Sequence, residues 1–279
     1  MMDPKLYLKV GDGEEVDVSE VVNGLKFLGD DEAPVMLQTY QSSVGLDGQL
    51  AQEINYDKSI VTAKFWLHFT DWYDYKLAKH EIYKLFNQRK QMRIRTDAEP
   101  AIVKYVLPTS FSISPTEDYS HDALFEIPFE NPSGYKYSLF RSDTPYTFEQ
   151  NGWQVGMNLP ADRIPTYHFT SSKFTVYNAS DIAVDPYYQK HDLKIISKFK
   201  GDSLKITNKT NGTEWAYKKK SDGTETIILD GVNSFRDGKS CGSDTDWGNL
   251  SLERGDNQIE VTGATSTDIT FSFPFLYLA

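Results

Sequence analysis

The stretch SIVTAKFWLHF, at positions 59–69, decides the class of fold that the rest of the chain must accommodate. Most of its residues are apolar, and apolar and polar side chains alternate along much of its length. An alternation of period two places successive side chains on opposite faces of a β-strand. A segment this long and this apolar predicts a strand that crosses the buried part of a sheet.

The segment that follows has a different period. Between Asp71 and Lys90, apolar residues recur at steps of three and four positions, which places them on one face of a helix. Either Asp71 or Asp74 can cap the first turn by accepting hydrogen bonds from free backbone N–H groups. The sequence predicts one helix, at about residues 72–90, inserted between strands. Its buried face is expected to consist of Tyr75, Ala78, Ile82, Leu85 and Phe86.

Short strand-like runs separated by turn signals lie on both sides of this helix. In the first half they lie at 5–10, 101–106, 111–113 and 124–130. In the second half they lie at 174–177, 193–196, 204–207, 226–229, 258–261 and 269–273, with Asn-Gly, Asp-Gly and Gly-Asp turns in this region. The chain is therefore expected to be mainly β, and its second half to be an antiparallel β-sandwich.

Length and a local change in composition predict two domains. One hydrophobic core usually serves about 100–200 residues, and this chain has 279. Residues 141–165 are richer in proline, glycine and polar side chains than either flank. We expect one domain at 1–143 and another at 144–279, with a linker or an extension at about 141–165.

Composition argues against several classes of protein. No stretch approaches the ~18–20 consecutive apolar residues of a membrane-spanning helix, and the first residues lack the basic and apolar regions of a signal peptide. Cys241 is the only cysteine, which excludes an intrachain disulfide and a cysteine-built metal cluster. Folding in a reducing cytoplasm is expected.

Charge and aromatic content favour protein contacts over nucleic acid. The 40 acidic and 29 basic residues give a net charge of -11, the wrong sign for gripping phosphate backbones, so no specific nucleic-acid binding is expected. Aromatic residues make up 14% of the chain. They favour strands and large flat interfaces.

The sequence contains no assembled catalytic or metal-binding motif. His80-Glu81 begins like a zinc-protease motif, but Lys84 occupies the position of the second histidine. No Walker loop, nucleophile elbow or dinucleotide fingerprint is present. We therefore predict no catalytic residue, no cofactor and no metal. Acidic pairs such as Asp181 with Asp185 leave a glycoside hydrolase as a minor alternative.

Two groups of residues are candidates for binding. Basic residues cluster at and just beyond the end of the predicted helix, where the helix dipole favours cations. They are candidates for contact with an acidic neighbouring subunit: Lys84, Arg89, Lys90, Arg93 and Arg95. Three aromatic residues, Trp215, Tyr217 and Trp247, are expected to serve core packing or a protein contact, with stacking on a saccharide as the alternative.

The order of segments resembles that of a known family. The strand at 60–67, the helix at 75–86, Tyr105-Val106 and the stretch 129–135 resemble the N-terminal region of siphophage distal tail proteins. The segments 176–178, 204–212, 252–257 and 271–278 are similar to the C-terminal domain of that family. The resemblance covers nearly the whole chain from about Val21 onward.

This resemblance implies a fold and a function. It implies an N-terminal belt domain, a split β-barrel with one inserted helix, and a galectin-like or carbohydrate-module-like C-terminal sandwich. Six belt domains would close into a hexameric ring at the virion tail tip, a hub that joins the tail tube protein to a tail-associated fibre or lysin protein. The periphery would carry receptor-binding proteins. The alternative is a carbohydrate-binding protein whose second domain binds cell-wall polysaccharide.

Overall fold

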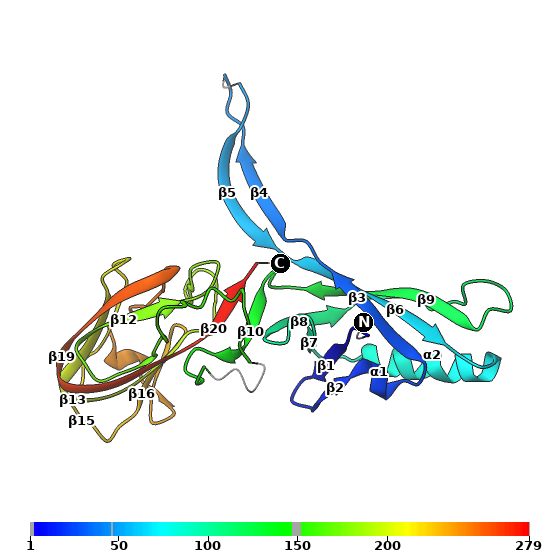
Figure 1. The fold of residues 1–279 in the computed structure, drawn as a ribbon. Coiled ribbons are helices and arrows are strands. Elements are labelled where there is room, and N and C mark those ends of the chain that lie inside the picture. Colours follow the sequence, from blue (N-terminus) through cyan, green and yellow to red (C-terminus); the bar gives the residue numbers. More distant parts are fainter. Residues whose placement is uncertain (1–2, 46, 147–151, 279) are drawn as a thin grey trace. The chain divides into compact units, whose positions relative to one another are not determined.

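The computed structural model describes residues 3–45, 47–146 and 152–278 and divides into two compact units. Unit 1 contains the described residues up to Lys136 together with Leu278, and unit 2 runs from Tyr137 to Tyr277. Figure 1 shows the elements of both. The predicted fold class, mainly β with one main helix, is confirmed.

Unit 1 is built on one antiparallel sheet. Its strands are β1 (Leu6–Val10), β2 (Glu15–Asp17), β3 (Leu25–Asp31), β6 (Ser59–His68), β7 (Met92–Thr96), β8 (Ile102–Pro108) and β9 (Asp122–Asn131), in the order β2-β1-β7-β8-β9-β6-β3. A one-turn helix, α1 (Val18–Val21), and the main helix, α2 (Trp72–Phe86), accompany it. The strands β4 (Val35–Gln41) and β5 (Leu50–Asp57) form a separate two-stranded sheet.

The strand β6 has the burial that its alternation predicts. Residues of one face, Val61, Ala63, Phe65 and Leu67, have no exposed surface. β6 pairs over its whole length with β9, and the ring of Phe65 stacks on that of Phe125 with 5.5 Å between centroids. β6 thus lies in the interior of the sheet, with β9 and β3 as neighbours.

The helix α2 packs onto this core along the predicted face. Tyr75, Ala78, Ile82 and Phe86 are buried. Asp71 is the N-cap, and its Oδ1 accepts hydrogen bonds from the backbone N–H groups of Tyr73 and Asp74 at 2.8 and 2.9 Å. The helix ends at Phe86, four residues before the predicted end, because the residues from 87 to 90 contribute no apolar side chain to the buried face.

Unit 2 is an antiparallel β structure organised on two long strands. Its strands are β10 (Lys136–Arg141), β11 (His168–Phe169), β12 (Lys173–Asn178), β13 (Lys194–Asn208), β14 (Glu214–Tyr217), β15 (Ser221–Asp222), β16 (Ile227–Asp230), β17 (Asn233–Arg236), β18 (Lys239–Ser240), β19 (Gly255–Ser272) and β20 (Pro274–Tyr277). A short 3-10 helix, η2, spans Gly242–Asp244. The long strands β13 and β19 pair with each other, and β10 pairs with β20.

The two long strands each join a pair of segments that the sequence predicts as separate strands. Residues 193–196 and 204–207 both fall in or beside β13, and 258–261 and 269–273 both fall in or beside β19. The pairing register shifts at Gly201, where φ is 150° and an added Cβ would lie 2.7 Å from the carbonyl oxygen of Gly263. Only glycine permits this close approach, so the break between the predicted strands is a bend within one strand.

The segment 141–165, expected as a linker or an extension, belongs to unit 2. Trp153 and Met157 are buried, and the N–H of Ser142 donates to the carbonyl oxygen of Phe273 at 2.8 Å. Residues 147–151 of this segment lie outside the described residues. The division between the two compact units lies between Lys136 and Tyr137.

Candidate functional site

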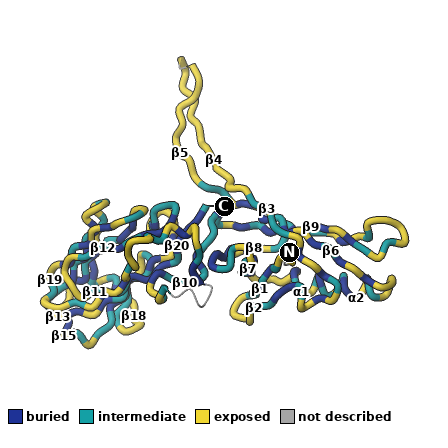
Figure 2. The backbone as a smooth tube through the Cα atoms, in the orientation of Figure 1, coloured by how far each residue is buried: buried dark blue, intermediate teal, exposed yellow. Residues whose placement is uncertain are grey.

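The most exposed element of the described chain is the hairpin β4–β5, residues 35–57, which we call the arm. Every residue of β4 is exposed, as are residues 50–55 of β5, and the arm extends away from the rest of unit 1 (Figures 1 and 2). Its strands pair only with each other. Seven large apolar side chains on the arm are at least 42% exposed: Val35, Met36, Leu37, Tyr40, Val44, Leu50 and Ile54.

The arm has a shift in pairing register between Thr39 and Tyr40 but lacks two common protections of exposed strand edges, lysine and proline. Natural edge strands carry lysine or proline, which prevents their open backbone groups from pairing with another chain. Between Lys26 and Lys58 there is no lysine or arginine, and the two strands contain no proline. The arm is thus an uncovered, apolar pair of strands with two open edges.

A buried charged network fixes the base of the arm. Glu32, the residue that follows β3, is only 4% exposed at its side chain and accepts a hydrogen bond from the hydroxyl of Ser59, the first residue of β6, at 2.7 Å. The ammonium of Lys104, from β8, lies 3.0 Å from Glu32 and 2.8 Å from Asp30. Burial alone would lower the pKa of Lys104, but the two carboxylates outweigh it and raise that pKa.

The turn after β9 holds the other side of the base. The amide of Asn131 donates to Glu32 at 3.3 Å, and the rings of Tyr56 and Tyr135 pack edge to face at 5.7 Å. At Gly134, φ is 68° and an added Cβ would lie 2.3 Å from the carbonyl oxygen of Asp57. The polypeptide at the root of the arm is therefore held tightly, while the rest of the arm is free.

The structure divides the predicted basic cluster into paired and unpaired residues. Arg93 and Arg95 lie side by side on one face of β7 and both reach Glu15, at 2.9 and 3.0 Å. Burial alone would raise the pKa of Glu15, but the two guanidinium groups lower it. Lys84 lies 3.5 Å from Glu81 on its own helix.

The remaining members of the cluster have no ion-pair partner among the described residues. Arg89 and Lys90 lie in the exposed segment 87–91, which follows α2 and which we call the basic turn. No described carboxylate approaches either side chain within 4.0 Å. Of the five predicted contact residues, only these two have no ion-pair partner among the described residues.

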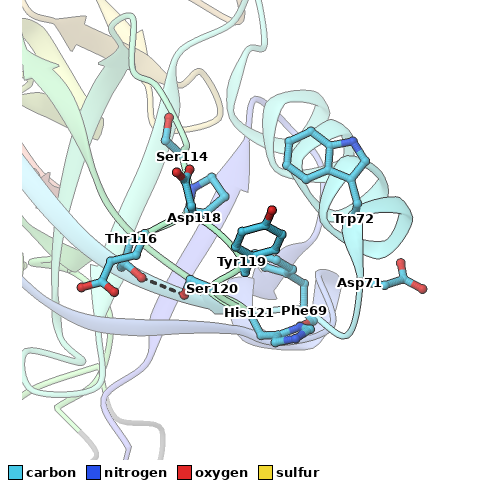
Figure 3. A pocket seen from close by; sticks show the side chains of 11 residues that line it. Phe69, Asp71, Trp72, Ser114, Thr116, Asp118, Tyr119, Ser120 and His121 are labelled. Carbon is cyan, nitrogen blue, oxygen red and sulfur yellow. Dashed lines mark hydrogen bonds between the residues drawn. The ribbon is translucent and has the colours of Figure 1, made fainter.

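A cleft of about 1060 Å³ lies at the opposite end of α2. Figure 3 shows Trp72, from the first turn of the helix, and Tyr119, from the loop that precedes β9, on its walls. Phe69 and His121 line the cleft between them, and the exposed carboxylates of Glu117 and Asp118 stand on the same loop. We call this site the α2 cleft. Sequence reasoning missed it, because its parts come from segments about 50 residues apart.

Hydrogen bonds make the loop of the α2 cleft rigid. The N–H of Phe69 donates to the carbonyl oxygen of His121 at 2.9 Å, and the N–H of Thr116 donates to that of Asp122 at 2.9 Å. The hydroxyls of Thr116 and Ser120 are 2.8 Å apart. The walls of the cleft are therefore in place before any partner binds.

The predicted aromatic contacts of unit 2 need a correction. Trp215 and Tyr217 are 1% and 0% exposed, so they cannot stack on a saccharide at the surface. They lie two residues apart on β14 and share its buried face, and the indole N–H of Trp215 donates to the hydroxyl of Ser234 at 3.1 Å. Residues two positions apart on a strand point to the same face, so the spacing of Trp215 and Tyr217 in the sequence favours core packing.

Trp247 is exposed, as predicted, and is held in an unusual conformation. Its side chain is 76% exposed and its φ is 63°, a region that bulky residues rarely adopt. Its ring covers Gly242, where an added Cβ would lie 3.0 Å from the indole. Asp246 fixes the loop by accepting from the N–H groups of Ala216 and Gly248, both at 2.9 Å.

Within the described ranges, the structure has neither a metal-binding cluster nor a helix that could span a membrane. There, no group of three or more His, Cys, Asp or Glu side chains is placed to hold a metal ion. No described helix has the length and hydropathy that crossing a bilayer requires.

Comparison with known proteins agrees with this architecture. Residues 11–131 match the family model of the phage tail protein RIFT-related domain. The Dit (gp 19.1) protein of SPP1, described as a paradigm of the hub adsorption apparatus of phages that infect Gram-positive bacteria, matches with a TM-score of 0.64. That match has 11% sequence identity and covers 97% of this chain and 99% of the SPP1 chain.

A chain of the phage P2 baseplate in its activated conformation with Ca matches at a TM-score of 0.46 and 11% identity, over 98% of both chains. Among curated proteins, none matches the sequence significantly. Residues 11–131 therefore match the phage tail protein RIFT-related domain, and the chain as a whole shares its fold with the SPP1 Dit protein.

Proposed function

We propose that this chain is a structural protein of the distal end of a siphophage tail, in which six copies of unit 1 close into a ring. The phage tail domain at residues 11–131 and the fold shared with the SPP1 hub protein support the proposal. The arm is the observation that carries it, because an element of this kind has a physical reason to exist only in an assembly.

The exposed apolar surface of the arm favours association with another copy. A two-stranded hairpin without further packing is marginally stable in water. This one exposes seven large apolar side chains that a monomer leaves in contact with solvent. Covering apolar surface contributes roughly 25 cal/mol per Å². Association with a neighbouring copy that covers the arm would gain this free energy. Because the base of the arm is already fixed, association would not have to order the root of the hairpin.

The ring would act as a hub. Its partners would be the tail tube protein on one face and a tail-associated fibre or lysin protein on the other, with receptor-binding proteins at the periphery. The protein would be made in the cytoplasm of the bacterial host and would reside at the virion tail tip. We assign it no catalytic role, and the carboxylates of the α2 cleft, on an exposed loop, serve in our proposal as contacts.

The mass of the purified chain in solution tests the ring. We expect light scattering to give a mass near six times 31.8 kDa, and negative-stain images of the same peak to show rings. A mass that stays at one chain at all concentrations would contradict a ring that forms without other tail proteins.

Saccharide binding by unit 2 is a second candidate function, which Trp247 favours. An exposed indole held over a glycine by a fixed loop offers a flat face of the kind that stacks on sugar rings. Binding of cell-wall polysaccharide by the full chain, and its loss in Trp247→Ala, is the expected result on a glycan array. Binding that survives this substitution, or no binding at all, would contradict it.

A further inference from the structure

The two ends of α2 carry exposed charges of opposite sign. At its C-terminal end, the basic turn presents Arg89 and Lys90, and at its N-terminal end, the α2 cleft presents Glu117 and Asp118. None of these four side chains has an ion-pair partner of opposite charge among the described residues. The helix has 15 residues, so at a rise of 1.5 Å per residue it separates the two patches by about 22 Å. The basic turn therefore cannot reach the cleft of its own copy.

The cleft has the chemistry to take a cationic side chain. Its volume of about 1060 Å³ lies at the upper end of the roughly 300–1,000 Å³ typical of ligand pockets. Guanidinium and ammonium groups bind on aromatic faces and to carboxylates, and the cleft offers both. Lys76, from the same helix, already lies over one face of the Trp72 ring, with 4.7 Å between Nζ and the centroid, so this ring takes part in cation–π contact.

Tyr119 gives an independent sign that the cleft is built for a partner. Its φ is 65° and its side chain is fully exposed, at the apex of a turn closed by the Ser120 N–H on the Glu117 carbonyl oxygen at 3.1 Å. A left-handed conformation is unfavourable for a residue with a side chain, and glycine avoids this cost. In the isolated copy the exposed ring gives no packing in return. An observed backbone outlier of this kind is a reason to look for function.

We propose that copies of this chain associate head to tail through unit 1, with Arg89 and Lys90 of one copy entering the α2 cleft of the next. The inference rests on the proposed ring and specifies one of its contacts. Because the two patches differ and lie on the same chain, the contact is heterologous and repeats from copy to copy, which generates a closed ring when the rotation between copies closes. The rigid loop of the cleft reduces the entropy that this contact costs.

Charge reversal on each side tests the contact. In one variant, Arg89→Glu and Lys90→Glu reverse the charge of the basic turn. In another, Glu117→Lys and Asp118→Lys reverse the charge of the α2 cleft. We expect each variant alone to lose the ring peak in light scattering. An equimolar mixture is expected to recover it, since the reversed turn of one variant fits the reversed cleft of the other. Recovery excludes misfolding as the cause of the loss.

The control variant makes a charge change of the same size and sign as the basic-turn variant, but at a different place in the chain. Lys198→Glu with Lys239→Glu alters two exposed lysines of unit 2 that have no ion-pair partner among the described residues, and we expect the ring to persist. If the wild type forms rings and both reversed variants do too, the contact is wrong and the proposed function stands. If the wild type itself stays monomeric at all concentrations, a ring formed by free copies is contradicted, and so is this contact between free copies.

Tyr119→Gly separates the contact from stability. The substitution removes a fully exposed ring and relieves the backbone strain, so we expect the melting temperature to stay equal or rise while the ring peak is lost or shifts to higher protein concentration. A ring of unchanged concentration dependence would show that Tyr119 takes no part in the contact.

Discussion

At the scale of single residues, Lys104 decides how the arm is held. Its side chain is 8% exposed, and its ammonium is shared by Asp30 and by Glu32, which is itself buried. Removing one partner of a buried ion pair leaves a charge without compensation, which typically costs about 3–5 kcal/mol. Lys104→Met should therefore cost unit 1 about 3 kcal/mol of unfolding free energy, as measured by native-state hydrogen exchange of its peptides.

The matching double variant distinguishes charge from packing. Adding Glu32→Gln to Lys104→Met removes the uncompensated carboxylate and retains an acceptor for Ser59, so part of the loss should be regained. A cost below about 1 kcal/mol for the single variant, in the range of an exposed pair, would show that the network contributes little.

The pH dependence of this network follows from the direction of the Lys104 pKa. The folded-state pKa is raised, so the stabilisation is fully present below the unfolded value of about 10.4 and is lost as pH rises through the folded value. Exchange from the base of the arm should therefore reflect a constant contribution from Lys104 between pH 6 and 9, and should accelerate beyond intrinsic rates only above about pH 10. In Lys104→Met, this alkaline change should be absent.

At the scale of elements, the arm and the helix differ in how far the sequence predicts them. The helix α2 has one buried face, and its period of three and four appears directly in the positions of Tyr75, Ala78 and Ile82. The arm has no buried face in this chain, so its apolar residues follow no regular period and the hairpin was not predicted. Periodicity reports burial within one chain and is silent on surfaces that a partner covers.

Substituting exposed apolar residues of the arm tests whether the arm is buried between copies. Leu37→Thr with Ile54→Thr keeps strand-forming side chains on β4 and β5 and removes two exposed apolar ones. Because exposed substitutions usually change stability by less than about 0.5 kcal/mol, the melting temperature should stay nearly constant. The mass in light scattering should fall toward one chain.

The matched control is Gln38→Thr with Asn55→Thr, which changes the polar neighbours of the same cross-strand pairs. This variant should retain the ring. A ring that survives loss of Leu37 and Ile54 would show that the arm is not buried between copies.

At the scale of the whole molecule, segment order predicted more than chemistry did. The mainly β class, the position of the helix and the resemblance to distal tail proteins could be read from the chain, because each rests on local periodicity and on order along the sequence. The contact sites could not. Glu15 neutralises Arg93 and Arg95 from about 80 positions away, and the two walls of the α2 cleft are brought together by the pairing of β6 with β9.

The open edges of the arm make the newly made chain prone to aggregation until it assembles. Two open strands without lysine or proline can pair with any other extended segment, so before assembly each copy carries a template for cross-β stacking. Closure of the ring competes with this stacking, and both processes accelerate as copies accumulate. We expect overproduction in the absence of partners to favour insoluble protein, and solubility in the infected cell to depend on how quickly neighbours bury the arm.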